Sequence, residues 1–432
     1  MLGWLWIGAC RPAVESPPPE PETPAVEVAE LRFDGAPPTR LLVLSLDTTR
    51  RDAVGRYGEG PSATPFLDAR LGESVVLDNH RSCSNWTGPS MLCATSGVDP
   101  VDIGAMRPND ALNRLPTLAR VLGEAGYATR LVSANPFFFG PDDALGFDDV
   151  TVLVDDAGRA EGVAARLRAD LDALRDGPRW YAHAHFFDPH DPYCPPEAYL
   201  DGLPPIPFDV CTDPSAAEFA MWTNGTDEQR KTYVAHLRFR FRAELRYFDD
   251  TLAALWADLD ARGDLDDTLV VFFTDHGEQF YERGTLGHSH ELFAEETAAV
   301  AAFWAKNLTP AAVTLPTVHQ DLAATIYAVF GALPQTTGSG RRLSEVTAGR
   351  TLGLVDVLQR FNTIAVVTHG QQLTLGYDDF RSFHDTTADP AMTESRYDPD
   401  DPDVLRAWSE MDAFLDRVEV AFPGWLPHDR EP

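Results

Sequence analysis

The stretch LLVLSLD, residues 41–47, is a continuous apolar run of strand length that ends on an acidic residue. Apolar residues at successive positions are typical of a strand buried on both faces, as in a mostly parallel sheet. Similar runs occur at 128–133, 180–186, 268–274 and 298–304, with helical patterns between them. This alternation predicts an α/β sandwich with a mostly parallel central sheet.

The longest helical pattern runs from about 227 to 262, where apolar side chains recur at the spacing of one helix face. Shorter helical patterns occur around 64–73 and 115–125. Beyond residue 349 the pattern changes, and the sequence predicts a small α+β subdomain made of a hairpin and a helix. These elements are expected at 363–368, 371–375 and 404–418.

The chain of 432 residues is strongly acidic, with a formal net charge of −32 at pH 7. Such a surface repels nucleic acid and anionic membranes, so we expect no nucleic-acid partner. A small anionic substrate would need locally concentrated positive charge, which a bound metal ion supplies.

The first ten residues, MLGWLWIGAC, end in a segment that resembles a bacterial lipobox, in which Cys10 would be lipidated. The apolar part is too short to span a bilayer, which takes about 20 residues, and it lacks a basic region. The run at 11–38 is rich in proline and glutamate and would form a semi-rigid tether. We therefore expect an exported protein, either a cell-envelope lipoprotein or a periplasmic or extracellular protein. The alternative is an incidental cysteine in a disordered leader.

Four further cysteines, Cys83, Cys93, Cys194 and Cys211, form no C-x-x-C pair, which argues against a zinc knuckle. In an exported protein they permit two disulfides. Cys194 and Cys211 flank a proline-rich loop and are the better candidate pair, whereas Cys93 lies in an apolar helical context and could equally be a buried thiol.

Polar residues that can carry chemistry occur in three segments. Asp47 ends the first strand, Thr87 in NWTGPSML precedes an apolar helix, and Asp275 and His276 follow the strand at 268–274. A hydroxyl at a helix N-terminus suits attack on an anion, and carboxylates with imidazole suit zinc or manganese. Taken singly, Asp47 and Thr87 could each be an ordinary helix cap.

Read together, LSLDTTRRD, NWTGPS, HFFDPHDPY, TDHGE and GHSHELF resemble, in the same order, the motifs of sulfatase-like enzymes in the alkaline phosphatase superfamily. The resemblance covers about 39–415. It implies an alkaline-phosphatase-like three-layer sandwich, with a sulfatase-like catalytic domain at 39–350 and the small subdomain at 351–432. It also implies a metal-dependent ester hydrolase.

When the family motifs are matched position by position, the resemblance implies that Asp47, Asp275 and His276 are metal ligands. It also implies that Thr87 is the nucleophile and a further ligand. His288 would complete a second metal site or contact the substrate. The expected cofactor is a divalent ion, with zinc or manganese favoured and calcium or magnesium as alternatives.

The same resemblance places His185 and His190 in the cleft as catalytic residues, one of which would protonate the leaving oxygen. Arg50 would hold the anionic oxygens of the substrate, or else form a structural salt bridge beneath the site.

Two departures from the family pattern bear on the substrate. His276 stands where sulfatases commonly have asparagine, which favours a metal that prefers nitrogen. Thr87 stands where sulfatases have a cysteine or serine that is converted to formylglycine. The leading hypothesis is therefore hydrolysis of phosphate mono- or diesters through a phosphothreonine. The alternatives are a sulfatase that works without formylglycine, a phosphoglycerol or phosphoethanolamine transferase, and a binding protein without activity.

Overall fold

The computed structural model describes residues 25–26, 30–104, 115–135, 145–177, 179–212, 214–332, 338–356, 363–376 and 379–423. Cys10 lies outside these ranges. Among the residues within them, no helix combines the length and the apolar character needed to cross a bilayer.

The core of the molecule is a nine-stranded sheet in which β11 alone runs antiparallel to its neighbours, among the strands described. The predicted mostly parallel sheet is confirmed, and β1 lies within the segment expected to be a tether. In spatial order the strands are β1 (Ala25–Val26), β12 (Ala311–Val313), β3 (Val75–Leu77), β11 (Ala301–Trp304), β8 (Thr268–Thr274), β2 (Arg40–Leu46), β7 (Trp180–Phe186), β5 (Ala128–Ser133) and β6 (Asp149–Val152).

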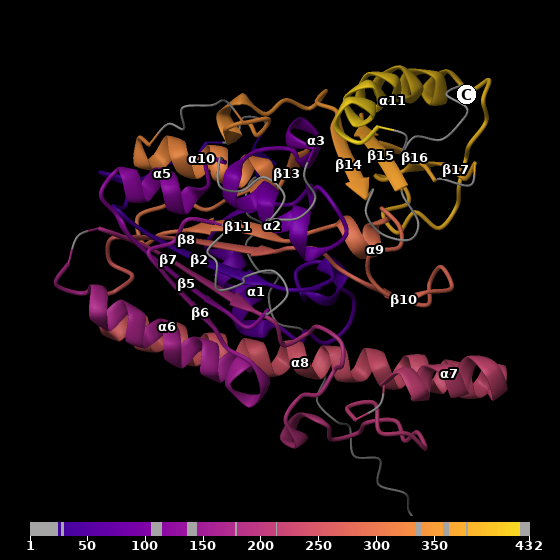
Figure 1. Cartoon of the computed structure of the whole chain (residues 1–432), viewed down its shortest axis with the longest axis horizontal. Helices are drawn as coiled ribbons and strands as arrows, with labels where there is room; N and C mark the ends of the chain where they lie inside the picture. Colours follow the sequence, from indigo (N-terminus) through magenta and orange to yellow (C-terminus); the bar gives the residue numbers. More distant parts are fainter. Residues whose placement is uncertain are drawn as a thin grey trace, which may run out of the picture.

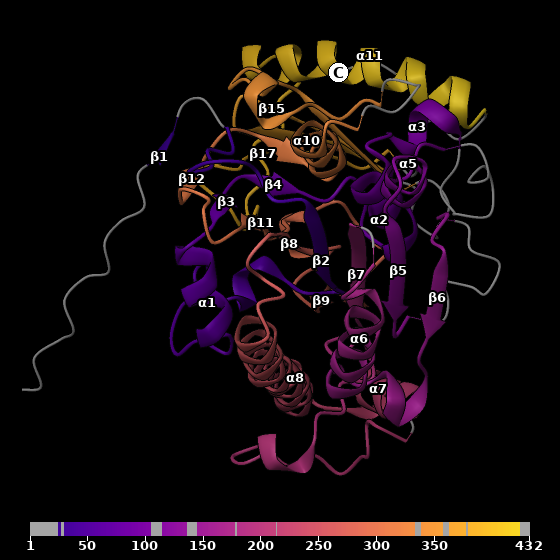
Figure 2. The ribbon, with the colours of Figure 1, turned by 90° about the vertical axis from the view of Figure 1, so that its left-hand side faces the viewer.

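Helices cover both faces of this sheet, so the predicted three-layer sandwich is confirmed (Figures 1 and 2). Because successive strand residues point to opposite faces, Leu42, Leu44 and Leu46 of β2 join one core cluster and Leu41 and Val43 join the other. The first cluster packs under α1 (Pro65–Gly72), α6 (Ala160–Leu174) and α8 (Asp227–Ala261), and the second under α2 (Thr87–Ser96), α5 (Leu118–Glu124) and α10 (Gln320–Phe330).

Helix α8 begins and ends close to the predicted limits, and a capping box fixes its start. The Thr226 side chain accepts from Gln229 N, and the Gln229 side chain accepts from Thr226 N. These bonds satisfy N–H groups that a helix start leaves without partners.

The C-terminal part forms a four-stranded antiparallel sheet with a helix across it, seen at the upper right of Figure 1. Its apolar core, which includes Val366, Leu373 and Trp408, is distinct from the two clusters on the faces of the large sheet. Its elements are β14 (Leu352–Asp356), β15 (Thr363–Thr368), β16 (Gln371–Leu375), β17 (Arg381–Asp385) and α11 (Pro402–Ala421).

Two disulfides are present, Cys83–Cys93 and Cys194–Cys211. The second is the pair favoured from the sequence. The first shows that the other two cysteines also pair. Cys93 is bonded to Cys83 and is not the free buried thiol that was the alternative.

Candidate active site

The site lies where four neighbouring strands end. β8, β2, β7 and β5 are adjacent and parallel, so their carboxyl ends meet at one edge of the sheet. Asp47 follows β2, Asp275 and His276 follow β8, and Asn135 lies two residues beyond β5. Backbone bonds hold this edge in register, with Asp47 N donating to Phe186 O (3.0 Å) and Asp275 N donating to Leu46 O (3.2 Å).

Asp47, Asp275 and His276 form a set of potential metal ligands. One donor atom from each lies within 4.8 Å of the other two, and all three side chains are fully buried. Asp47 Oδ1 and Asp275 Oδ2 are buried without a hydrogen-bond partner. Buried carboxylate oxygens without partners are costly, and a divalent cation between them would offset that cost.

The orientation of His276 also fits a metal ligand. Its Nδ1 lies 2.9 Å from the carbonyl oxygen of Gly277, which can only accept, so Nδ1 carries the proton. In the neutral ring Nε2 then has a free lone pair, and it lies 3.7 Å from Asp47 Oδ1 and 3.5 Å from Asp275 Oδ2. Such a backbone partner on the opposite nitrogen commonly fixes the tautomer of a metal-binding histidine.

The two carboxyl groups differ in their pKa values. Burial alone would raise the pKa of Asp47, but the hydrogen bond from His185 and the nearby histidines hold it below its usual range. Burial and the negative charge of Asp47 raise the pKa of Asp275 well above its usual range. A divalent cation would favour the ionised form of both.

Thr87 is the first residue of α2, and its Oγ1 lies 3.4 Å from Asp47 Oδ2 and 3.4 Å from His276 Nε2. The N-cap is Trp86, and no side chain caps this helix. Thr87 is therefore not the ordinary N-cap that was one reading of its sequence, and its hydroxyl faces the donor set instead.

A chain of polar groups extends from Asp47 into the core. His185 Nε2 lies 3.0 Å from Asp47 Oδ2, and Ser45 Oγ lies 2.8 Å from both His185 Nδ1 and His183 Nε2. Tyr181 OH lies 3.3 Å from His183 Nδ1. Each group can donate to the next toward Asp47. His185 is fully buried behind Asp47, a place that suits orienting this carboxylate and not protonating a leaving group.

The more open side of the site carries two other histidines. The ring centroid of His288 lies 4.5 Å from that of His276 and 5.2 Å from that of His190. Both His190 and His288 line a cavity of about 340 Å³ with Glu278. The Glu278 carboxyl is fully buried and accepts from Tyr193 OH at 2.6 Å, and burial raises its pKa to about 8.

The guanidinium of Arg50 is already hydrogen-bonded to other residues of the chain. Its guanidinium bonds both oxygens of Asp52 (2.9 and 2.6 Å), Glu282, and the carbonyl oxygen of Glu278 (3.2 Å). This geometry matches the salt-bridge reading of Arg50 better than the substrate-binding one.

Two residues at the site were not anticipated. Asn135 Nδ2 donates to Asp47 Oδ2 at 2.9 Å, and its position just beyond β5 is the signal that could have found it. Glu296 lies in the short helix α9 (Ala294–Thr297) and accepts from Asn85 Nδ2 (3.0 Å), Gln279 Nε2 (2.6 Å) and His290 N (3.1 Å). It thereby ties the loop before Thr87 to the segment after His288, and no local sequence pattern indicates this role.

This fold, with buried acidic and imidazole donors beside a hydroxyl at the edge of the sheet, is that of an ester hydrolase of the alkaline phosphatase superfamily. The chain belongs to the Sulfatase family, whose family model matches residues 39–332.

Solved structures with the same fold include two phosphonate monoester hydrolases. The enzyme of Agrobacterium radiobacter is 17% identical with a TM-score of 0.68, covering 89% of this chain and 96% of that one. SpPMH of Silicibacter pomeroyi is 19% identical with a TM-score of 0.67, covering 90% and 96%. BT4656, solved with its substrate D-glucosamine-2-N,6-O-disulfate, is 15% identical with a TM-score of 0.70, covering 91% and 100%.

A curated relative, the multifunctional alkaline phosphatase superfamily protein PehA of Trinickia caryophylli, is 26% identical over 143 residues. The match spans 28% of this chain and 28% of that protein. The similar proteins thus include enzymes named for phosphonate esters and one solved with a sulfated sugar.

Proposed function

We propose that this protein hydrolyses phosphate mono- or diesters through a covalent intermediate on Thr87. The observation that carries the proposal is the position of Thr87 Oγ1, which is 3.4 Å from both Asp47 Oδ2 and His276 Nε2 and free of any capping bond. A nucleophile placed beside a metal-binding set is the arrangement that activates a hydroxyl.

The ion we propose for this set is zinc or manganese, because Asp47, Asp275 and Thr87 offer oxygen and His276 offers nitrogen. When bound, a divalent ion would lower the pKa of the Thr87 hydroxyl and neutralise charge on the attacked group.

The reaction has two steps at phosphorus. Thr87 Oγ1 loses its proton to solvent and forms a bond to phosphorus, the bond between phosphorus and the ester oxygen breaks, and that oxygen leaves with a proton from His190 or His288, which line the open side of the site. Water then attacks phosphorus and gives a proton to the histidine that lost one in the first step, the bond between phosphorus and Thr87 Oγ1 breaks, and Oγ1 regains a proton from solvent. His185 acts in both steps by holding Asp47 in place.

Trapping the intermediate tests this proposal. Metal-loaded protein mixed with an aryl phosphate and quenched in acid should gain the mass of one phosphoryl group, located on Thr87 by peptide mass spectrometry. The Thr87→Ala variant is the control and should gain none. A phosphoryl group on another residue, or aryl phosphate turnover that proceeds with no adduct and no burst of phenol, would refute a Thr87 intermediate.

A second prediction concerns the metal. Elemental analysis of active protein should find at least one divalent ion per chain, and Asp275→Ala should lose it together with activity. Asp188→Asn is the control, because the partly buried Asp188 carboxyl lies outside the donor set and accepts from Ala160 N at 2.8 Å, at the start of α6. This variant should keep its metal. Active protein without zinc, manganese, calcium or magnesium would contradict the assignment.

We further propose that the protein is exported and that its only membrane contact is a lipid on Cys10. The two disulfides support export, since such bonds persist in oxidising compartments. Native protein should partition into detergent, whereas Cys10→Ser should not. If the intact mass of the native protein shows that Cys10 carries no lipid, this hypothesis is wrong.

A further inference from the structure

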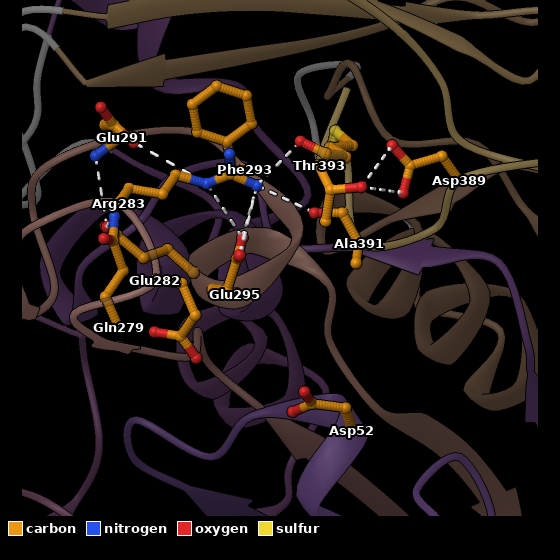
Figure 3. A network of polar contacts seen from close by, with 12 residues as sticks. Asp52, Gln279, Glu282, Arg283, Glu291, Phe293, Glu295, Asp389, Ala391 and Thr393 are labelled. Atoms are coloured by element: carbon orange, nitrogen blue, oxygen red, sulfur yellow. Dashed lines mark hydrogen bonds and ion pairs between the residues drawn. The ribbon is translucent and has the colours of Figure 1, made fainter. Parts of the chain in front are cut away.

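A second cavity lies apart from the metal-binding set, between the segment after Asp47 and the C-terminal subdomain. It measures about 720 Å³, and none of Asp47, Thr87, Asp275 or His276 lines it. Sites for small molecules in proteins typically measure about 300–1,000 Å³. Figure 3 shows part of the surrounding region, with Asp52 on one side and Glu295 and Ala391 on the other.

The cavity wall contains two guanidiniums that form no ion pair with a carboxylate among the described residues. Three wall carboxylates are already paired with arginines: Asp52 with Arg50, Asp78 with Arg56, and Glu295 with Arg283. Of the remaining charged residues that line the cavity, Glu59 is exposed, and the other two are Arg51 and Arg81.

Arg81 is the more unusual of these two. It belongs to β4 (His80–Arg81) and is 5% exposed, yet among the described residues no carboxylate forms an ion pair with it. Its guanidinium makes one weak bond, to Thr297 Oγ1 at 3.4 Å, and its Nε is buried without a partner. Burial of a guanidinium without a carboxylate is costly unless something else compensates its charge.

The fold fixes Arg81 in this position despite that cost. β4 pairs with β13 (Thr317–Val318), and Arg81 forms an isolated bridge with Ala298 on the other side. Burial and the positive charge of Arg51 lower the pKa of Arg81 to about 10, which still leaves it charged at neutral pH.

Arg51 supplies the second cation. Its guanidinium carbon lies 4.4 Å from the ring centroid of Tyr57. Within the described part of the chain, Arg51 has no carboxylate within ion-pair distance. Arg51 and Arg81 both line this cavity and neither forms an ion pair with a described carboxylate, so together they form a site where an anion would be bound by charge-assisted hydrogen bonds.

We infer that this cavity binds a small molecule that carries a phosphate or sulfate group, held between Arg51 and Arg81. The volume exceeds what a bare oxyanion fills, and Ala294, Ala298, Pro390 and Ala391 offer apolar surface for an organic part. The site is separate from the catalytic centre and does not depend on the proposed phosphoesterase activity. Its occupant would bridge the catalytic domain and the C-terminal subdomain, which both line the cavity.

Calorimetric titration of the metal-loaded protein tests the inference, with inorganic phosphate and phenylphosphonate as probes. One binding event per chain should weaken about tenfold or more in Arg81→Gln and in Arg51→Gln, since a hydrogen bond to a charged group contributes about 1.5–3 kcal/mol. Arg166→Gln, which removes an arginine from α6 on another part of the molecule, should bind as the wild type does. Asp275→Ala should keep this event even if it loses another at the metal set.

The two probes distinguish the source of the anion. Tighter binding of phenylphosphonate indicates an organic ligand, and equal binding indicates inorganic phosphate. If Arg81→Gln does not fold, two other experiments test the site. Binding to Arg51→Gln should be weakened, and wild-type crystals soaked in tungstate should show heavy-atom density between the two arginines. Unchanged binding in folded variants, or no density there at saturating tungstate, would overturn the inference.

Discussion

Aryl phosphates or phosphodiesters are expected to turn over orders of magnitude faster than the matching aryl sulfates, compared as kcat/KM on metal-loaded protein. The reason is the chemistry of Thr87. Formylglycine hydrate has two hydroxyls, so one attacks sulfur and the other then expels sulfate by cleaving a carbon–oxygen bond. Threonine has a single hydroxyl and cannot become an aldehyde.

A sulfated Thr87 would therefore have to be released by water attacking sulfur, for which the site offers no evident assistance. A phosphorylated Thr87 can be cleared by attack of water on phosphorus in line, a reaction that metal sites promote. Sulfate esters should consequently give at most one turnover per chain.

The control for this comparison is a pair of substrates with the same aryl leaving group, so that departure of the phenol is equally easy in both. Repeated release of sulfate at a kcat/KM close to that for phosphate would restore the sulfatase alternative. Transfer of the phosphoryl group to an added alcohol in preference to water would favour the transferase alternative instead.

Much of the fold is predictable because its strands are buried on both faces. The runs at 128–133, 180–186 and 268–274 coincide with β5, β7 and β8, since apolar side chains are needed at every position there. Asp47, Asp275 and His276 follow from the same logic, because each comes directly after such a strand and the strands end at one edge. Thr87 was found by its place before an apolar helix.

What the sequence could not supply are contacts between elements that are distant along the chain. Ser45 bonds His183 and His185 because β2 and β7 are neighbours with Ser45 opposite His185. That register also places His185 behind Asp47, a position that the HFFDPHDPY motif alone does not reveal. The contacts of Glu296 and Arg81 could not be predicted for the same reason, because their partners come from segments that are distant along the chain.

Loss of the Thr87 hydroxyl is expected to have the largest effect of any single substitution. Thr87→Ala should lower kcat for phosphate esters at least about a thousand-fold, as removal of a catalytic nucleophile does. The methyl side chain should leave α2 intact, because the Thr87 side chain does not cap this helix. Metal content and thermal stability should therefore stay near those of the wild type, except for any contribution of Oγ1 as a ligand.

Thr87→Ser is the matched variant, because it keeps the hydroxyl and removes only a methyl group from a buried side chain. It should retain phosphoesterase activity and form the same covalent adduct, now on serine. This pair separates nucleophilic attack from packing. Both variants lose the γ-methyl group of threonine, but only Thr87→Ala loses the attacking oxygen. If Thr87→Ala keeps substantial kcat while binding metal normally, attack must come from water directly. The 3.4 Å contacts of Thr87 Oγ1 with Asp47 and His276 would then serve only to position the metal-binding set.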